Sequence, residues 1–170
     1  MKSKGNIVFL GMMGSGKTSI GKLFSQKYKI KFYDIDHLIE KDLGMKISKI
    51  FKIKGEIFFR NFEEKVTLKI LQKKNIIISL GGGSFLNKKV QKEILNNHTS
   101  FWLNWDNGTI IDRIQKSHKR PLAIKSTIDD LNDLIKKRSN IYAKAMYKID
   151  CNGLSKKEIV NKIFETYETN

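Results

Sequence analysis

The chain has 170 residues, of which 40% are hydrophobic and 10% aromatic, which is enough for one globular domain with a buried core and excludes a disordered chain. Its formal net charge is +16, but 29 of the 33 basic residues are lysines scattered through every segment, without the dense block or lysine–aromatic alternation of a nucleic-acid binder. A broad bias towards Lys, Ile and Asn therefore explains the charge better than specific nucleic-acid binding, although a positive field would attract anionic substrates.

Cysteine content and hydropathy bear on the compartment. The single cysteine, Cys151, cannot form an internal disulfide, which favours a reducing compartment. No apolar stretch approaches the roughly 20 residues of a membrane helix. The apolar run before Gly11 is too short for a signal-peptide core and lacks a small-residue cleavage site. We expect a soluble, cytoplasmic protein without a membrane partner.

Short apolar runs alternate with longer amphipathic ones, the pattern of an α/β protein with a parallel sheet. In chain order, the expected strands are Asn6–Leu10, Lys31–Ile35, Ile76–Leu80, Ser100–Leu103 and Met146–Cys151. The expected helices are Lys17–Tyr28, Glu56–Lys73, Leu131–Ala145 and Ser155–Tyr167, the last with a capping box formed by Ser155 and Glu158. The polar stretch Ser117–Thr127 holds the only proline and is expected to be a mobile loop. There is no repeat or linker, so we expect one domain over residues 1–170.

The first strand leads into a phosphate-binding motif. Residues 11–18 read GMMGSGKT, which matches G-x-x-x-x-G-K-[ST] in full, and an amphipathic helix follows. Its glycines let backbone N–H groups converge on phosphate oxygens at a helix N-terminus. We expect Lys17 to reach the β- and γ-phosphates and Thr18 to hold Mg²⁺. The residues expected to bind the nucleotide here are Gly14, Ser15, Gly16, Lys17, Thr18 and Ser19. The motif alone does not identify the group that receives the phosphate.

The second strand ends with two carboxylates, Asp34 and Asp36. At strand spacing both would point to the same face, at the carboxyl end where ligands collect in open α/β sheets. One could order the water shell of a metal while the other accepts a hydrogen bond from a substrate hydroxyl. The alternative is equally well supported by these residues alone: Asp36 is the N-cap of a helix that begins here.

Two further features indicate an acceptor site. Three glycines, Gly81–Gly83, directly follow the third strand, where a ligand could lie against bare backbone. The chain has only four arginines, and among so many lysines an arginine indicates a place where the planar, five-donor guanidinium is needed. The four are Arg60, Arg113, Arg120 and Arg138.

The sequence resembles the shikimate kinase family over almost its whole length. The segments that carry the resemblance, in the family's order and spacing, are GMMGSGKTSIG (11–21), FYDIDHLIE (32–40), GEIFFRNFEE (55–64), SLGGGSF (79–85), RPLA (120–123) and KRSNIY (137–142). The resemblance implies a P-loop, nucleoside-monophosphate-kinase-like fold: a five-stranded parallel sheet flanked by helices. It also implies a substrate-binding subdomain near 36–62, a lid near 113–126 and a monomer.

The resemblance further implies the reaction ATP + shikimate → ADP + 3-phosphoshikimate with Mg²⁺, and roles at the acceptor. Asp36 would hydrogen-bond shikimate hydroxyls and could act as a base. Arg60 and Arg138 would bind the shikimate carboxylate, while Gly82 and Gly83 would add backbone contacts. The aromatic residues that would shape the pocket are Phe51 and Phe59.

On the nucleotide side, the resemblance implies that Asp34 binds Mg²⁺ through water. Arg120 would be the lid arginine that reaches the transferring phosphate, together with Lys17. Arg113 would lie over the adenine.

Two segments depart from the family's pattern. The family's R-x-P-L-Y reads RSNIY at 138–142, without the proline, and its RPLL reads RPLA at 120–123. Both segments keep the arginine, so the departures bear on lid dynamics or stability more than on chemistry. Two other hypotheses are another small P-loop kinase, such as a gluconate kinase, and a basic nucleic-acid-binding ATPase or degenerate P-loop protein. The paired arginines and triple glycine oppose the first, and the intact phosphate motif and dispersed lysines oppose the second.

Overall fold

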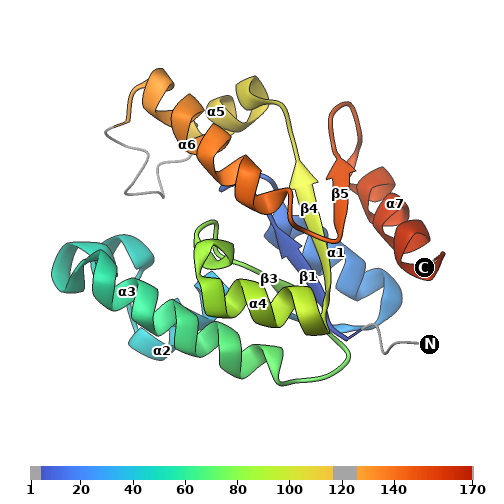
Figure 1. Ribbon diagram of the computed structural model, residues 1–170, viewed down its shortest axis with the longest axis horizontal. Helices are drawn as coiled ribbons and strands as arrows, with labels where there is room; N and C mark the ends of the chain where they lie inside the picture. Colours follow the sequence, from blue (N-terminus) through green and yellow to red (C-terminus); the bar gives the residue numbers. More distant parts are fainter. Residues whose placement is uncertain (1–4, 117–125, 170) are drawn as a thin grey trace.

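A computed structural model describes residues 5–116 and 126–169, which form a parallel five-stranded sheet between layers of helices (Figure 1). The strands have the spatial order β2-β3-β1-β4-β5. Their bounds are β1 Ile7–Leu10, β2 Lys31–Asp34, β3 Ile76–Ser79, β4 Thr99–Asn104 and β5 Tyr147–Asp150. All five predicted strands are confirmed, and every end lies within one residue of the expected one.

Alternation of side chains along the strands divides the interior into two cores. On β1, Val8 and Leu10 face one core, whereas Ile7 and Phe9 face the other. The first core lies under the layer that contains α2 to α6, and the second lies under α1 and α7. The strands in the middle of the sheet are covered on both faces, and for this reason β3 reads as an unbroken apolar run, Ile76 to Ile78.

The helices match the predictions unevenly. Their bounds are α1 Lys17–Tyr28, α2 Ile35–Leu43, α3 Ile47–Leu71, α4 Lys88–Asn97, α5 Asn107–Gln115, α6 Ile128–Tyr142 and α7 Lys156–Glu168, with a 3₁₀ turn, η1, at Ser84–Leu86. The prediction of α1 is confirmed residue for residue, and the capping box of α7 is present with Ser155 and Glu158. Helices α4 and α5 were not expected. Helix α6 starts earlier than expected because Thr127 caps it in a second capping box, so Thr127 belongs to a helix end rather than to a loop.

Helix α3 contains a break that the sequence interpretation missed. Gly55 has φ 81° and ψ 169°, a backbone conformation that is essentially restricted to glycine, and it separates two helical segments. The predicted helix Glu56–Lys73 corresponds to the second segment, which ends at Leu71. The first segment, together with α2, forms the outer end of the region 36–62 that was expected to bind substrate (Figure 1).

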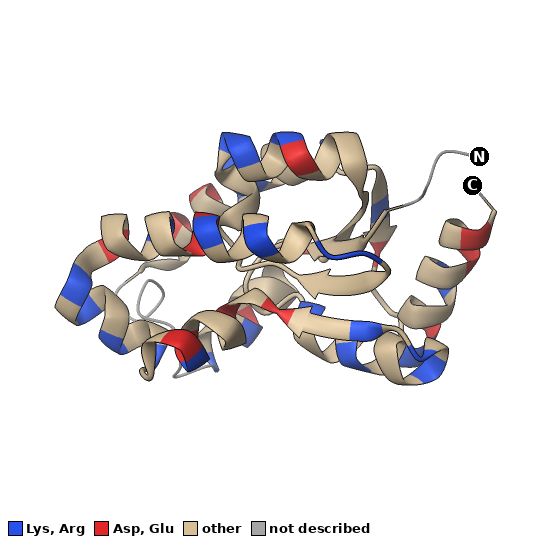
Figure 2. Cartoon of the chain, turned by 90° about the horizontal axis from the view of Figure 1, so that it is seen from below, with Lys and Arg blue, Asp and Glu red and all other residues tan. Residues whose placement is uncertain are grey.

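Lysine and arginine residues, blue in Figure 2, are spread over helices throughout the molecule rather than gathered in one block. This agrees with the dispersed charge expected from the sequence. Within residues 5–116 and 126–169, no helix is both long enough and apolar enough to cross a membrane.

Candidate active site

A cleft of about 1030 Å³ opens at the carboxyl ends of the central strands. Its walls come from the phosphate loop (residues 11–18), the end of β2, helices α2 and α3, the glycine turn (Gly81–Gly83) and Arg138 on α6. In an open α/β sheet this is the position where ligands bind, because loops that follow neighbouring parallel strands meet there.

The phosphate loop is shaped by glycines with positive φ. Gly11 has φ 140°, and a Cβ there would lie 2.9 Å from the carbonyl oxygen of Leu103. Gly16 has φ 87° and is the N-cap of α1 without a side-chain cap, so the N-terminal amides of the helix remain available to an anion. Lys17 is buried, and its Nζ donates to the carbonyl oxygens of Gly11 and Met12 at 2.9 Å each. A buried ammonium thus lies in the loop expected to hold phosphates.

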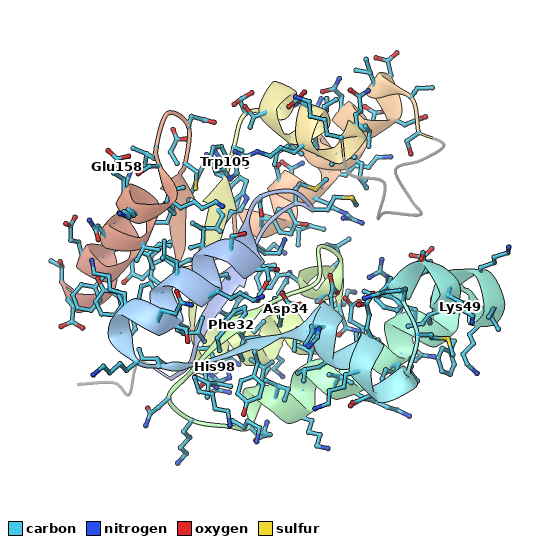
Figure 3. All side chains as sticks on the ribbon, turned by 180° about the vertical axis from the view of Figure 1, so that it is seen from behind. Phe32, Asp34, Lys49, His98, Trp105 and Glu158 are labelled. Carbon is cyan, nitrogen blue, oxygen red and sulfur yellow. The ribbon has the colours of Figure 1, made fainter. Side chains whose placement is uncertain are left out.

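Asp34 connects the phosphate loop to the acceptor wall, the side of the cleft formed by α2, α3, the glycine turn and Arg138. Its Oδ2 accepts a hydrogen bond from the Thr18 hydroxyl at 2.5 Å, and its Oδ1 accepts one from the backbone N–H of His37 at 3.1 Å. Asp34 is therefore the N-cap of α2. Figure 3 shows it between the elements that carry the phosphate loop and α2.

Two expectations about this pair of carboxylates are corrected. Asp36 does not continue the strand, because β2 ends at Asp34 and the helix begins at Ile35. The cap is Asp34 and not Asp36, since capping by Asp34 turns the chain into the helix. Asp36 lies in the first turn of α2 and still lines the cleft, with Oδ1 only 2.7 Å from where a Cβ on Gly81 would be.

Arg60 is held by a set of contacts that the sequence did not reveal. Its Nη1 donates to Glu63 Oε2 at 2.7 Å, and its Nε donates to Glu56 Oε1 at 3.3 Å. Glu63 Oε1 in turn accepts the Ser84 hydroxyl at 2.6 Å. Burial lowers the pKa of Arg60, but the two carboxylates outweigh it and raise that pKa above its ordinary value, so the guanidinium stays charged.

Glu63 is the principal site residue that the sequence analysis missed. It is only 3% exposed, and a carboxylate buried to this extent needs a partner, which here is the guanidinium of Arg60. The available signal was its spacing: Glu63 follows Phe59 by four residues and precedes Val66 by three, so it interrupts the apolar face of the helix. Phe59 and Phe51, expected to shape the pocket, pack with ring centroids 4.7 Å apart and line the cleft.

The glycine turn lies between the two arginines of the acceptor wall. A Cβ on Gly83 would lie 2.5 Å from Arg60 Nη1, and one on Gly82 would lie 3.4 Å from Arg138 Nη1. Arg138 is 6% exposed, and its buried Nε has no hydrogen-bond acceptor among the residues that the structure describes. Residues from α3 and α6, far apart in the sequence, thus bring two guanidinium groups to one turn.

The missing proline leaves α6 uninterrupted. The helix runs through Asn140 to Tyr142, so Arg138 and Tyr142 are one turn apart and both are buried. The Tyr142 hydroxyl donates to the carbonyl oxygen of Gly82 at 2.5 Å. Burial raises the pKa of Tyr142 to about 12, which keeps this hydroxyl protonated.

A Trp–Arg pair lies beside the phosphate loop on the side of β4. The guanidinium carbon of Arg113 lies 3.9 Å from the ring centroid of Trp105, and Nη1 donates to the Gly14 carbonyl oxygen at 3.2 Å. Trp105 Nε1 donates to the Ser15 carbonyl oxygen at 2.9 Å. Arg113 therefore lies at the outer side of the phosphate loop, and Trp105 (Figure 3) is a second residue that the sequence analysis missed.

The structure thus brings together most of the predicted site residues. Those that line the cleft are Gly14, Gly16, Lys17, Thr18, Ser19, Asp34, Asp36, Arg60, Gly82, Gly83 and Arg138. Ser15 is buried within the loop. Arg120 and most of the expected lid, 117–125, lie outside the described residues, whereas 113–115 are the last residues of α5.

Comparisons with known proteins point to one family. The family model described as "Shikimate kinase" matches residues 13–168. The shikimate kinase of Persephonella marina is 39% identical over 93% of this chain and 96% of its own. The solved structure of shikimate kinase from Acinetobacter baumannii in complex with shikimate has a TM-score of 0.92 at 27% identity, covering 99% of this chain and 96% of that one. Deoxyadenosine kinase from M. mycoides, at 16% identity and a TM-score of 0.62 over 96% of this chain and 98% of that one, shares the fold.

Proposed function

Because the chain belongs to the shikimate kinase family, we propose that its cleft binds ATP on the phosphate loop and shikimate against the glycine turn. The protein is an ATP-dependent kinase that transfers the γ-phosphate to the 3-hydroxyl of shikimate and yields 3-phosphoshikimate. This is a step in the biosynthesis of chorismate and the aromatic amino acids. The observation that carries the assignment of the site is the pair of guanidinium groups, Arg60 and Arg138, on either side of Gly82 and Gly83.

Shikimate carries one carboxylate. Two arginine side chains that lie beside the same glycine turn suit such a group. A guanidinium can bind a carboxylate through two parallel hydrogen bonds, which fixes orientation as well as charge. Glu63 and Glu56 hold the Arg60 side chain in place through hydrogen bonds to its Nη1 and Nε atoms. We therefore assign Arg60 and Arg138 to the carboxylate, Gly82 and Gly83 to backbone contacts, and Asp36 to the hydroxyls of shikimate.

ATP would place its phosphates on the amides of residues 14–19. Lys17 would exchange its carbonyl partners for the β- and γ-phosphate oxygens. Arg113, next to Trp105, is assigned to the adenine end of the nucleotide. Arg120, from the lid, is assigned to the transferring phosphate.

Mg²⁺ is the metal that the family implies, and the residues fit it. Thr18 and Asp34 present two oxygen-bearing side chains 2.5 Å apart at the rim of the phosphate loop. Mg²⁺ prefers oxygen ligands and keeps several waters, so a hydroxyl with a carboxylate behind it suits the ion. When bound, it would neutralise charge on the β- and γ-phosphates.

Transfer in such a site depends mainly on positioning and charge neutralisation. Asp36 would orient or deprotonate the attacking hydroxyl. Lys17 and Arg120 would stabilise the negative charge on the equatorial oxygens. A lid over 113–126 would exclude water and so limit ATP hydrolysis. We further propose that the enzyme works as a cytoplasmic monomer.

A coupled ADP-release assay tests the function directly. Purified protein with Mg-ATP should release ADP rapidly with shikimate and hardly at all with gluconate or AMP. The methyl ester of shikimate keeps the hydroxyls but lacks the charge, so it should be a poor acceptor. Equal stimulation by all acceptors would overturn the assignment, and turnover of the ester as fast as the acid would overturn the carboxylate site.

A further inference from the structure

Tyr142 joins two walls of the cleft through one hydrogen bond. Its ring is 1% exposed and packs against Trp102, with ring centroids 6.1 Å apart. From the last turn of α6, its hydroxyl reaches across to the carbonyl oxygen of Gly82 in the turn after β3. Nothing in the phosphate-transfer chemistry uses this hydroxyl, yet it contacts the turn assigned to shikimate.

The bond determines where the next amide points. The described residues contain no cis peptide, so the Gly82 carbonyl and the Gly83 N–H point in opposite directions across one planar unit. The carbonyl faces Tyr142 in the interior. The Gly83 N–H is therefore directed away from the interior, and Gly83 lines the cleft beside Arg60. Within the described part of the chain, this N–H has no hydrogen-bond acceptor.

A run of three glycines needs such an anchor. Without side chains, Gly81–Gly83 can adopt many backbone conformations, and the peptide between Gly82 and Gly83 could rotate at little steric cost. The hydroxyl of Tyr142 restricts this rotation from inside the protein. Arg138 is on the same face of α6 as Tyr142, one turn earlier. The hydrogen bond of Tyr142 therefore also fixes the position of the Gly83 N–H relative to the Arg138 guanidinium.

We propose that Tyr142 is a positioning residue for the acceptor: its hydroxyl fixes the Gly82–Gly83 peptide so that the Gly83 N–H donates to shikimate. This rests on the proposed function of the cleft. Tyr142 touches neither substrate, and it acts through the peptide. Its pKa of about 12 agrees with a hydroxyl that remains a donor at physiological pH.

The test is Tyr142→Phe, which removes one oxygen and keeps the ring. The matched control is Tyr28→Phe, whose ring stacks on Phe164 at 4.0 Å on the other side of the sheet. Calorimetry should show weaker binding of shikimate to Tyr142→Phe by about 2- to 12-fold, the equivalent of one ordinary hydrogen bond. KM for shikimate should rise by a similar factor, while the Kd for ATP and kcat change less. Tyr28→Phe should match the wild type.

The outcomes separate the inference from the proposed function. A wild-type protein without shikimate-dependent turnover would refute the function. An active wild type with unchanged shikimate binding in Tyr142→Phe would refute the positioning role, and so would equal loss of ATP and shikimate binding, which indicates general loosening. Should the variant fail to fold, ¹⁵N NMR on the wild type decides: the Gly83 amide proton should move downfield on addition of shikimate, and no movement overturns the proposal.

Discussion

The substitution Gly83→Ala tests the geometry of the acceptor site most sharply. Gly83 has φ −101° and ψ −13°, which alanine adopts without strain, so the backbone should tolerate the change. The added Cβ would lie 2.5 Å from Nη1 and 2.8 Å from Cζ of Arg60. Ordinary contact starts at 3.4 Å, so the guanidinium would have to withdraw by about 0.9 Å. Because the clash is with the end of a side chain, the cost should fall on substrate binding rather than on folding.

The size of the effect follows from that displacement. A misplacement of about 1 Å can cost on the order of 100-fold in rate, and one charge-assisted hydrogen bond is worth about 1.5–3 kcal/mol. We expect kcat/KM for shikimate to fall by roughly 10- to 150-fold, at about tenfold per 1.4 kcal/mol. The Kd for ATP and the thermal midpoint should change little. Steady-state kinetics, calorimetric titration with ATP and thermal unfolding measure the three quantities.

Gly82→Ala is the matched control for this experiment. Its Cβ would lie 3.4 Å from Arg138 Nη1 and from the backbone nitrogen of Met13, at the edge of ordinary contact. The backbone contacts assigned to Gly82 remain possible in this variant, so we expect a smaller fall in kcat/KM for shikimate than in Gly83→Ala. If Gly83→Ala keeps wild-type kcat/KM, or if the two variants behave alike, Arg60 does not bind the acceptor in the position described.

Three other predictions concern the arginines, the metal and pH. Arg60→Lys and Arg138→Lys conserve charge but lose the paired donors, so each should lower kcat/KM for shikimate about 10- to 150-fold with little change in the Kd for ATP; wild-type values in both would refute the carboxylate site. Asp34→Asn removes the charge behind the Thr18 hydroxyl, so the Mg²⁺ concentration needed for half-maximal activity should rise; an unchanged Mg²⁺ titration would contradict this assignment. Burial holds the pKa of His98 below its ordinary value of 6.5 despite the nearby Glu93 carboxylate, so the unfolded chain binds its proton at higher pH than the folded protein does. The free energy of unfolding should therefore decrease as pH falls below about 6.5, and urea unfolding should show a weaker decrease for His98→Gln; equal slopes would refute the contribution of His98.

The strands and the phosphate loop could be predicted because their signals are local. An apolar run such as Ile76–Ile78 or a complete glycine motif specifies its own structure, whatever the rest of the chain does. Helices α4 and α5 were missed because each shows a short apolar pattern. In α4 only Val90 and Ile94 are buried, one turn apart among lysines, and the cap that starts the helix is Asn87.

The acceptor wall was predicted through a family resemblance, and its geometry could not be read from residue spacing. Asp36 reaches the cleft from a helix rather than from a strand, since the side chain of Asp34 ends the strand by capping α2. Glu63 and Tyr142 are unremarkable in the sequence: one interrupts an apolar helix face, and the other ends a helix. Glu63 pairs with Arg60 three residues earlier on the same helix, but the contact of Tyr142 with Gly82 spans 60 positions and is identified only by the fold.

The strand order has a consequence for how such an enzyme can diverge. β1 lies in the middle of the sheet. Of the groups assigned to shikimate, all but Arg138 follow β2 and β3 on one side, whereas Trp105 and Arg113 follow β4 on the other. Mutations that accumulate in α2, α3 and the glycine turn can therefore change the acceptor while selection continues to preserve nucleotide binding. The fold itself tolerates extensive sequence divergence, since deoxyadenosine kinase from M. mycoides shares it at 16% identity. An enzyme with this strand order can thus change its acceptor specificity while its ATP-binding residues stay the same.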